Sequence, residues 1–254
     1  MILRRVMQHV KEQNWTAIGI ELVIVVLGVF LGMQVSNWND SRVERERELV
    51  LLGELRAELA DSIRQTAIKQ KAFEQIALSG ERAIAFLDSG NTCGDTCWPV
   101  IVDFFHASQW QAMIVELPTY DELRRNGWPR KRAIVDAMEA YKRQALQVAK
   151  PLDQPPAYRA LVRGLIPFAI HEPYWASCFQ LADGEEAYVE DCPQGVPAEI
   201  SATGVDAIVR HPDIHRTLTE WVGYSAASIE ALDSQNQSAS RAMKLVGAEL
   251  GEQQ

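Results

Sequence analysis

The feature that most constrains this chain is an uninterrupted apolar stretch close to its first residue. Residues 16–35 read TAIGIELVIVVLGVFLGMQV, with Glu21 as their only ionisable side chain. Twenty helical residues span about 30 Å, the thickness of the hydrocarbon core of a bilayer. Trp15 and Trp38 bracket the stretch, about 34 Å apart along a helix axis, where indole rings prefer the membrane interface. The sequence therefore predicts a transmembrane helix over 16–38.

A cleaved signal peptide is the competing interpretation of this stretch. Its apolar region would run for only about 7–15 residues. No small-x-small cleavage site followed by a fresh start is evident around residues 33–37. We therefore expect an anchor that is not cleaved.

Basic residues flank the predicted membrane helix on both sides, so the positive-inside rule alone does not orient it. They are Arg4, Arg5 and Lys11 before the helix, and Arg42, Arg45 and Arg47 after it. The short tail also carries the amino-terminal charge, and long C-terminal domains translocate largely regardless of charge. We therefore expect residues 1–15 to be a cytoplasmic amphipathic tail and residues 39–254 to be an exported domain.

The charge balance argues against one class of partner. The chain of 254 residues has 25 Lys and Arg against 34 Asp and Glu, giving a net charge of −9 and a pI near 5.1. Residues 1–38 hold three basic and two acidic side chains, so 22 basic and 32 acidic remain beyond them, a net −10. Nucleic-acid binding needs a basic face, so we predict that nucleic acid is not a partner.

One face of the predicted membrane helix carries Glu21, Gly28 and Gly32. At 100° per residue, both glycines lie within about 20° of Glu21. A Gly-x-x-x-Gly pair lets two helix backbones approach closely, and a carboxyl in a membrane is costly unless it is protonated or paired. The pattern predicts helix association, either with an identical helix or with a basic residue of another membrane protein. Extension of Glu21 to the headgroups is the alternative.

Apolar and small residues recur at helical steps of three, four or seven at both ends of the exported domain. The first series is Leu52, Leu55, Leu59, Ile63, Thr66, Phe73, Ala77, Ile84 and Leu87, with a candidate break near Ser79 and Gly80. The second is Ile214, Leu218, Trp221, Ser225, Ile229, Leu232, Ala239, Met243, Val246 and Leu250. Two long helices would bury these stripes against each other, or each against its copy in a dimer.

Between these two series the pattern favours shorter helices. They are expected around residues 99–115, 119–126, 130–148, 156–170 and 204–210, with a proline-rich break at 151–156. Residues 171–200 are expected to be loop-rich, and strand signals are weak. The fold class that follows is all-α: an N-terminal transmembrane helix followed by an extramembrane helical bundle with two long helices.

The chain has four cysteines, in two turn-rich segments: Cys93 and Cys97, then Cys178 and Cys192. An even number in an exported domain favours disulfides. Of three connectivities, local pairing within each segment is the simplest. A four-cysteine zinc site lacks the usual C-x2-C spacing, and C-x3-C is not the spacing of thioredoxin-like redox motifs.

Evidence for catalysis or metal binding is weak. His211 and His215 are four residues apart and would share a helix face, but Pro212 interrupts them and no His-Glu-x-x-His motif is present. There is no Gly-x-Ser-x-Gly element, phosphate loop or dinucleotide fingerprint. We predict no metal, cofactor or catalytic residue, with these two histidines as weak candidate ligands, and we do not expect enzymatic activity.

A basic cluster lies in the middle of the acidic domain. It consists of Arg124, Arg125, Arg130, Lys131 and Arg132. One interpretation is a docking patch for anionic lipid headgroups, polyanionic glycans or an acidic partner. The other is a solvated turn that pairs with the surplus carboxylates.

Two segments resemble a known family. Residues 17–29 followed by Gln34-Val35-Ser36-Asn37-Trp38-Asn39 look like the N-terminal signature of a broad family of uncharacterised bacterial single-pass membrane proteins. Residues 119–127, TYDELRRNG, are similar to the family's second recurrent stretch, from which Arg124, Arg125 and Trp128 depart. The resemblance implies a membrane-anchored helical protein, and it transfers no activity, substrate or site residue.

These features together predict a non-enzymatic, single-pass protein of the bacterial inner membrane with a periplasmic domain. Its expected role is that of an interaction, sensory or scaffold protein that associates through the Glu21, Gly28 and Gly32 face. An accessory subunit of a membrane complex is the first alternative. An anchored metal-dependent hydrolase that uses His211 and His215 is the weaker one.

Overall fold

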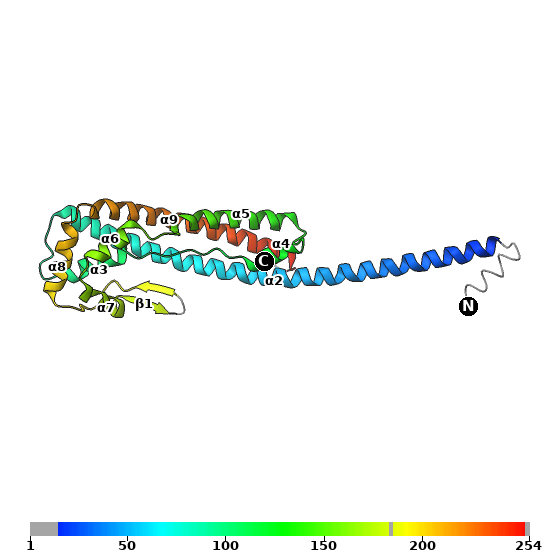
Figure 1. Ribbon diagram of the computed structural model, residues 1–254, viewed down its shortest axis with the longest axis horizontal. Coiled ribbons are helices and arrows are strands. Elements are labelled where there is room, and N and C mark those ends of the chain that lie inside the picture. The colour runs from blue at the N-terminus through cyan, green and yellow to red at the C-terminus, as the bar shows by residue number, and fades with distance from the viewer. Residues whose placement is uncertain (1–14, 183–184, 252–254) are drawn as a thin grey trace. The chain divides into compact units, whose positions relative to one another are not determined.

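The computed structural model describes residues 15–182 and 185–251 (Figure 1). The predicted amphipathic tail lies outside these residues, apart from the backbone of Trp15 at the start of the first helix. The chain divides into two units, Met1–Leu52 (unit 1) and Gly53–Gln254 (unit 2), which are described separately below.

Unit 1 contains the first part of α2, which runs over Trp15–Ser89. The large apolar side chains from Ile20 to Val35 are 52–64% exposed. An 18-residue window of this helix has a mean hydropathy of 2.1 and no buried residue. Such a surface is unfavourable in water and favourable in lipid. Within the described residues one helix is long and apolar enough to cross a membrane, which indicates a single-pass membrane protein.

Unit 2 is built of helices, as predicted, with one short antiparallel hairpin. Its elements after α2 are α3 (Cys97–Ala107), α4 (Pro118–Arg125), α5 (Arg132–Ala149), η1 (Lys150–Leu152), α6 (Ala157–Leu165), α7 (Phe168–Ser177), β1 (Phe179–Ala182), β2 (Glu185–Tyr188), α8 (Ala198–Val209) and α9 (Ile214–Glu249). The all-α fold class is thus confirmed.

The two long helices pack against each other in antiparallel orientation within unit 2. Gln235 Nε2 on α9 donates to Thr66 Oγ1 on α2 at 3.2 Å, and the Phe73 and Trp221 rings lie 6.2 Å apart. A Cβ at Gly80 would overlap Cγ2 of Val222. The predicted break near Gly80 is therefore wrong: the absent side chain lets α9 approach a helix that continues.

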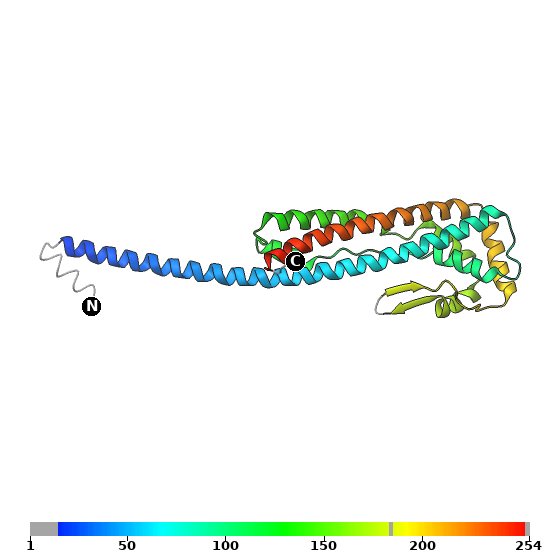
Figure 2. The ribbon, with the colours of Figure 1, turned by 180° about the vertical axis from the view of Figure 1, so that it is seen from behind.

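α5 completes a three-helix arrangement, because it lies alongside α9 in both views of the ribbon (Figures 1 and 2). Gln144 Nε2 donates to Ser234 Oγ at 2.6 Å, and Lys131 pairs with Glu249 at 3.3 Å. The short helix α4 covers the end of unit 2 at which α9 finishes. There the Thr119 amide donates to a carboxylate oxygen of Glu58 on α2 at 3.0 Å.

At the other end of unit 2, α3 provides the centre of an aromatic core. Trp98, Ile101, Phe104 and Phe105 are almost completely buried there. α8 packs closely on α3, because a Cβ at Gly204 would stand 2.8 Å from Ile101 Cδ1.

Three predictions for the shorter elements are wrong. Residues 156–170 form two helices, because Ile166 precedes Pro167 and adopts an extended backbone, ψ 124°. The helix expected to 115 ends at Ala107, where the Ser108 hydroxyl bonds back to the Phe105 carbonyl at 2.6 Å. Residues 171–200 are less irregular than predicted, because α7 continues to Ser177 and a hairpin follows with Phe179 opposite Tyr188.

Candidate functional site

The predicted association face lies on the exposed helix of unit 1. Gly28 and Gly32 are exposed, and a Cβ added at either would meet no atom within 4 Å. Glu21 is partly buried. Trp38 is exposed, as an interface anchor requires, whereas the side chain of Trp15 lies outside the described residues. Association through this face stays a prediction, because the structure contains a single chain.

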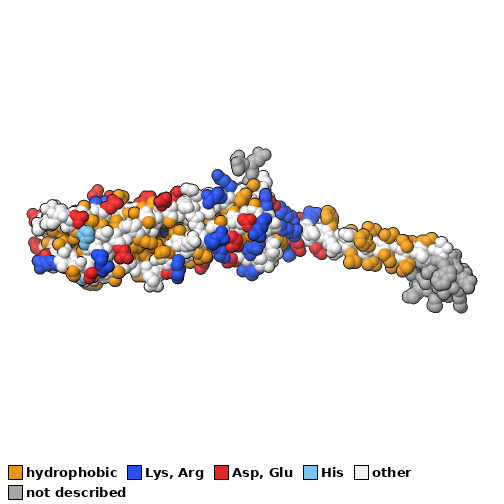
Figure 3. Space-filling view, turned by 90° about the horizontal axis from the view of Figure 1, so that it is seen from above, with side chains coloured by type: hydrophobic (Ala, Val, Ile, Leu, Met, Phe, Trp, Pro, Cys, Tyr) orange, Lys and Arg blue, Asp and Glu red, His pale blue; other side chains and the backbone are white. Residues whose placement is uncertain are grey.

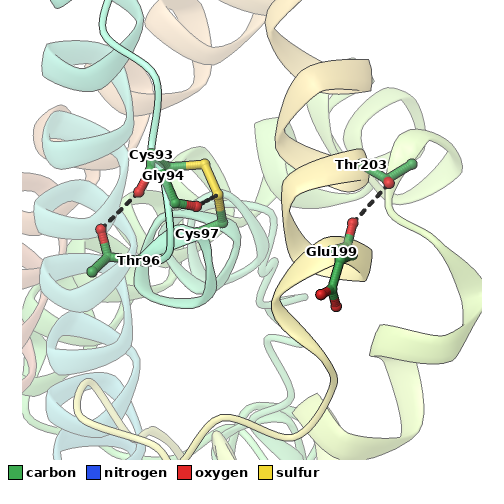
Figure 4. Close-up of a disulfide and its surroundings, with 6 residues drawn as sticks. All are labelled: Cys93, Gly94, Thr96, Cys97, Glu199 and Thr203. Atoms are coloured by element: carbon green, nitrogen blue, oxygen red, sulfur yellow. Dashed lines mark hydrogen bonds between the residues drawn. A yellow bond between two sulfur atoms is a disulfide. The ribbon is translucent and has the colours of Figure 1, made fainter.

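Both local disulfides are formed. Cys93 bonds to Cys97 and Cys178 to Cys192, with Cα atoms 4.9 and 5.0 Å apart. The first closes a tight turn before α3, in which the Thr96 hydroxyl donates to the Cys93 carbonyl at 2.8 Å (Figure 4). No described cysteine is free. Paired cysteines are typical of an oxidising compartment.

The second disulfide lies next to a buried histidine that the sequence did not single out as a site. His106 Nε2 on α3 is 3.1 Å from the Cys178 carbonyl oxygen. A carbonyl only accepts, so Nε2 carries the proton. Nδ1 is buried and has no hydrogen-bond partner among the residues that the structure describes. Burial is the main cause that lowers the pKa of His106 to about 4, and the positive charge of Arg82 contributes in the same direction. His106 is therefore neutral at physiological pH.

Polar side chains beside His106 tie the hairpin and the extended residues 109–117 to the helices. We call the following residues the hairpin cluster: Lys69, Gln75, Gln109, Gln111, Arg159, Arg163, Tyr174, Glu186 and Tyr188. Gln75 holds both backbone polar groups of Tyr188, at 3.1 and 3.3 Å. Gln111 donates to the Glu186 carboxylate and to the Tyr188 hydroxyl.

The two arginines of the hairpin cluster come from α6. Arg159 donates to the Ser108 carbonyl at 2.9 Å, and Arg163 donates to Ser108 Oγ and Gln109 Oε1, both at 2.9 Å. The Arg163 guanidinium also lies 5.0 Å from the centre of the Phe105 ring. Burial lowers the pKa of Arg163 to about 10, and neighbouring Arg159 contributes.

The hairpin cluster is suited to holding structure in place. Each cation of the hairpin cluster has a hydrogen-bond partner. Arg159 and Arg163 donate to Ser108 and Gln109, and the Lys69 ammonium donates to the Ala112 carbonyl at 2.8 Å. Burial lowers the pKa of Lys69, opposed by the nearby charge of Glu186. No local sequence pattern indicates this cluster. Apart from the contact of Tyr188 with Glu186, its bonds join residues between 43 and 113 positions apart, such as Lys69 with Ala112 and Gln75 with Tyr188.

A groove of about 350 Å³ lies between α2, residues 113–116, α5 and α9. Its lining includes Met113 and Val115 on one side and the buried side chains of Thr66, Tyr141 and Gln235. Gln235 Oε1 is buried without a hydrogen-bond partner. Gln235 therefore uses its Nε2 to donate to Thr66, while its Oε1 is a buried acceptor in the groove lining for which the described residues provide no donor.

The two histidines considered as metal ligands are separated by the fold. α9 begins only at Ile214, so His211 precedes the helix, and the expectation of a shared helix face is wrong. His211 Nδ1 accepts from the Asp213 amide at 3.2 Å, whereas His215 Nε2 pairs with Asp88 on α2 at 2.8 Å. No group of three or more His, Cys, Asp or Glu side chains is placed to hold a metal within the described residues.

The basic cluster forms an exposed turn between α4 and α5. We call residues 124–132 the basic turn. α4 ends in a Schellman motif: Gly127 adopts φ +78°, its amide donates to the Arg124 carbonyl at 3.2 Å, and the Trp128 amide donates to the Leu123 carbonyl at 2.8 Å. Leu123 and Trp128 are buried. The backbone of the basic turn is therefore held in one conformation by these hydrogen bonds and by the buried Leu123 and Trp128, and the charged side chains extend from it.

The five charged side chains of the basic turn are all exposed. They are Arg124, Arg125, Arg130, Lys131 and Arg132. Arg124 donates to the Trp128 carbonyl at 3.3 Å, Lys131 pairs with Glu249 at 3.3 Å, and Arg132 pairs with Asp136 at 2.9 Å. At least Lys131 and Arg132 therefore pair with carboxylates, as one of the two interpretations of the cluster predicted.

Comparisons with protein-family models, curated proteins and solved structures found no match for this chain. The resemblance to bacterial single-pass proteins, carried by residues 17–39 and 119–127, therefore stays a prediction.

Proposed function

We propose that the protein is a single-pass inner-membrane protein whose unit 2 is a periplasmic interaction module, with a sensory or scaffold role. The N-terminal tail would lie in the cytoplasm. The chain would associate through Glu21, Gly28 and Gly32, with itself or with another membrane protein. It acts by contact, and chemical catalysis has no part in this proposal.

One observation carries the proposal: a fully exposed apolar helix in unit 1 belongs to the same chain as two disulfides in unit 2. The helix requires lipid, and the disulfides require an oxidising compartment. Both requirements are met when unit 2 stands on the periplasmic side of a bacterial inner membrane.

The first experiment tests this location. The full chain is expressed in bacteria, free thiols are trapped with a maleimide-coupled polymer, and the membranes are washed with alkaline carbonate. We expect the chain to remain in the membrane and to show no mobility shift until reductant is added before trapping. Release by carbonate would contradict the anchor, and immediate labelling of four thiols would contradict the periplasmic placement.

The second experiment tests association. Replacing Gly28 and Gly32 with isoleucine should block close helix approach and lower the native mass of the detergent-solubilised protein. Gly19→Ile is the matched control, because Gly19 lies about 160° around the helix from Glu21 and has equal space around it. Equal masses for the wild type and the double variant would overturn the association.

Glu21→Gln distinguishes the two kinds of partner. A neutral amide leaves a pair of protonated carboxyls nearly intact but removes a salt bridge to a basic residue. Loss of a stoichiometric second protein from the purified Glu21→Gln variant would make the chain an accessory subunit. Retention of a self-associated oligomer would support the scaffold role.

A further inference from the structure

The basic turn stands out against the charge of unit 2. Residues 53–254 carry 19 Lys and Arg and 28 Asp and Glu, a net −9, yet residues 124–132 hold five basic side chains and no acidic one. Figure 3 shows Lys and Arg side chains gathered over one end of unit 2. A surface of this kind attracts anions to one end of a domain that otherwise repels them.

This end is also the one at which the chain enters unit 2. Thr119 at the start of α4 contacts Glu58, five residues after Gly53, and Lys131 pairs with Glu249 at the end of α9. Both ribbon views place α4 and the chain end C beside this part of α2 (Figures 1 and 2). The basic turn therefore belongs to the end of unit 2 that the anchor precedes.

The distance between this end and the bilayer is limited by the chain itself. Gly53 follows Trp38 by fifteen positions on the same helix, a rise of about 22 Å. This is an upper limit on the distance from Trp38 to Gly53, the first residue of unit 2. Headgroups extend several ångströms beyond the hydrocarbon core, and charges attract across a Debye length of about 8 Å. Tethering makes docking an intramolecular step, which needs little affinity.

We propose that the basic turn docks on anionic phospholipid headgroups of the membrane in which the chain is anchored. This inference rests on the proposed membrane anchor. The Schellman motif fixes the backbone, and the exposed guanidinium groups of Arg125 and Arg132 carry paired donors with the geometry that phosphate oxygens accept. The exposed ion pair of Arg132 with Asp136 is weak and exchanges readily for a phosphate.

The test uses the full chain in lipid nanodiscs of neutral phosphatidylcholine, or of the same lipid with about 30% phosphatidylglycerol. Asn126→Cys provides the only free thiol, because the native cysteines are paired. A donor dye on this thiol reports energy transfer to an acceptor on headgroup-labelled lipid. We expect higher transfer in anionic discs, and loss of the difference in 0.5 M salt, where the Debye length is about 4 Å.

Two triple variants distinguish the effect of the basic turn on docking from the effect of the net charge of the protein. R125Q/R130Q/R132Q should lower the ratio of docked to undocked protein about 100-fold, since each basic residue strengthens attachment by roughly five-fold. The matched control also removes three charges, from exposed side chains outside the turn, and should dock like the wild type. It is K150Q/R210Q/R216Q.

The outcomes separate this proposal from the anchor on which it rests. Failure of the wild type to enter nanodiscs would refute the anchor and the docking together. Entry with equal energy transfer in neutral and anionic discs would refute only the docking. Equal loss of docking in the two triple variants would show an effect of net charge and would also overturn the proposal. Binding of the turn to heparin without a response to lipid would favour a glycan and refute the lipid.

Discussion

Protonation of His106 should lower the stability of unit 2 in mild acid. The imidazole is completely buried, and burial depresses its pKa in the folded state to about 4, from an ordinary value of 6.5. Between these two values the unfolded chain binds more protons than the folded chain. The free energy of unfolding therefore rises with pH through this window, and it falls as the pH drops from 6.5 towards 4.

The size of the effect follows from the two pKa values. Between pH 7.5 and pH 5.0, the linkage relation gives a loss of about 2 kcal/mol from this one group. Arg82, Tyr174 and Tyr188 lie around the ring, and none of them supplies a negative charge to hold an imidazolium. Asp103 pairs with Arg82 at 2.7 Å, so its charge is already engaged.

The assay is denaturant unfolding of the full chain in non-ionic detergent, followed by tryptophan fluorescence at pH 7.5 and 5.0. His106→Gln keeps an amide donor for the Cys178 carbonyl and removes the titration, so the wild type should lose about 2 kcal/mol more than this variant over the pH step. His211→Gln removes a different imidazole and should keep the His106 contribution. Equal losses for the wild type and His106→Gln would refute the reasoning.

The remaining predictions concern packing, backbone and cross-links, and the same unfolding assay at pH 7.5 checks each of them. Gly80→Ala should destabilise unit 2 by about 1–3 kcal/mol, because its Cβ overlaps Val222; unchanged stability would mean that α9 moves aside at no cost. Gly127→Ala should lower the free energy of unfolding by about 1 kcal/mol, because Gly127 has a φ of +78°, which is unfavourable for a residue with a Cβ. A gain in stability would contradict this prediction. Replacing Cys178 and Cys192 with serine should cost about 3 kcal/mol, since the bond closes a loop with a sequence separation of 14; a loss below about 0.5 kcal/mol would contradict this estimate.

Features with a short repeat in the sequence were predictable. The steps of three and four residues that mark Leu52, Leu55 and Leu59 correspond to completely buried positions on α2. Local spacing also led to both disulfides. The division of residues 156–170 was within reach as well, because Pro167 disfavours a helical conformation at the residue before it.

Features that join distant residues were not predictable in this way. Gln75 and Tyr188 exchange two hydrogen bonds across 113 positions, and Gln109 reaches Tyr174 across 65. From the sequence alone, each of these polar residues would be expected on the surface. Their burial follows only once α6 and the hairpin close over residues 109–117, which single-sequence patterns do not encode.

The two proposed contacts depend on different forces, so ionic strength separates them. Docking of the basic turn is electrostatic and intramolecular, and it should disappear once the Debye length is shorter than the gap between the charges. Association at Gly28 and Gly32 rests on close packing inside the hydrocarbon core, where salt does not enter. Raising salt should therefore release unit 2 from the headgroups while the assembly keeps its mass. Loss of both contacts together would mean that docking holds the oligomer, and it would move the association site from the membrane helix to unit 2.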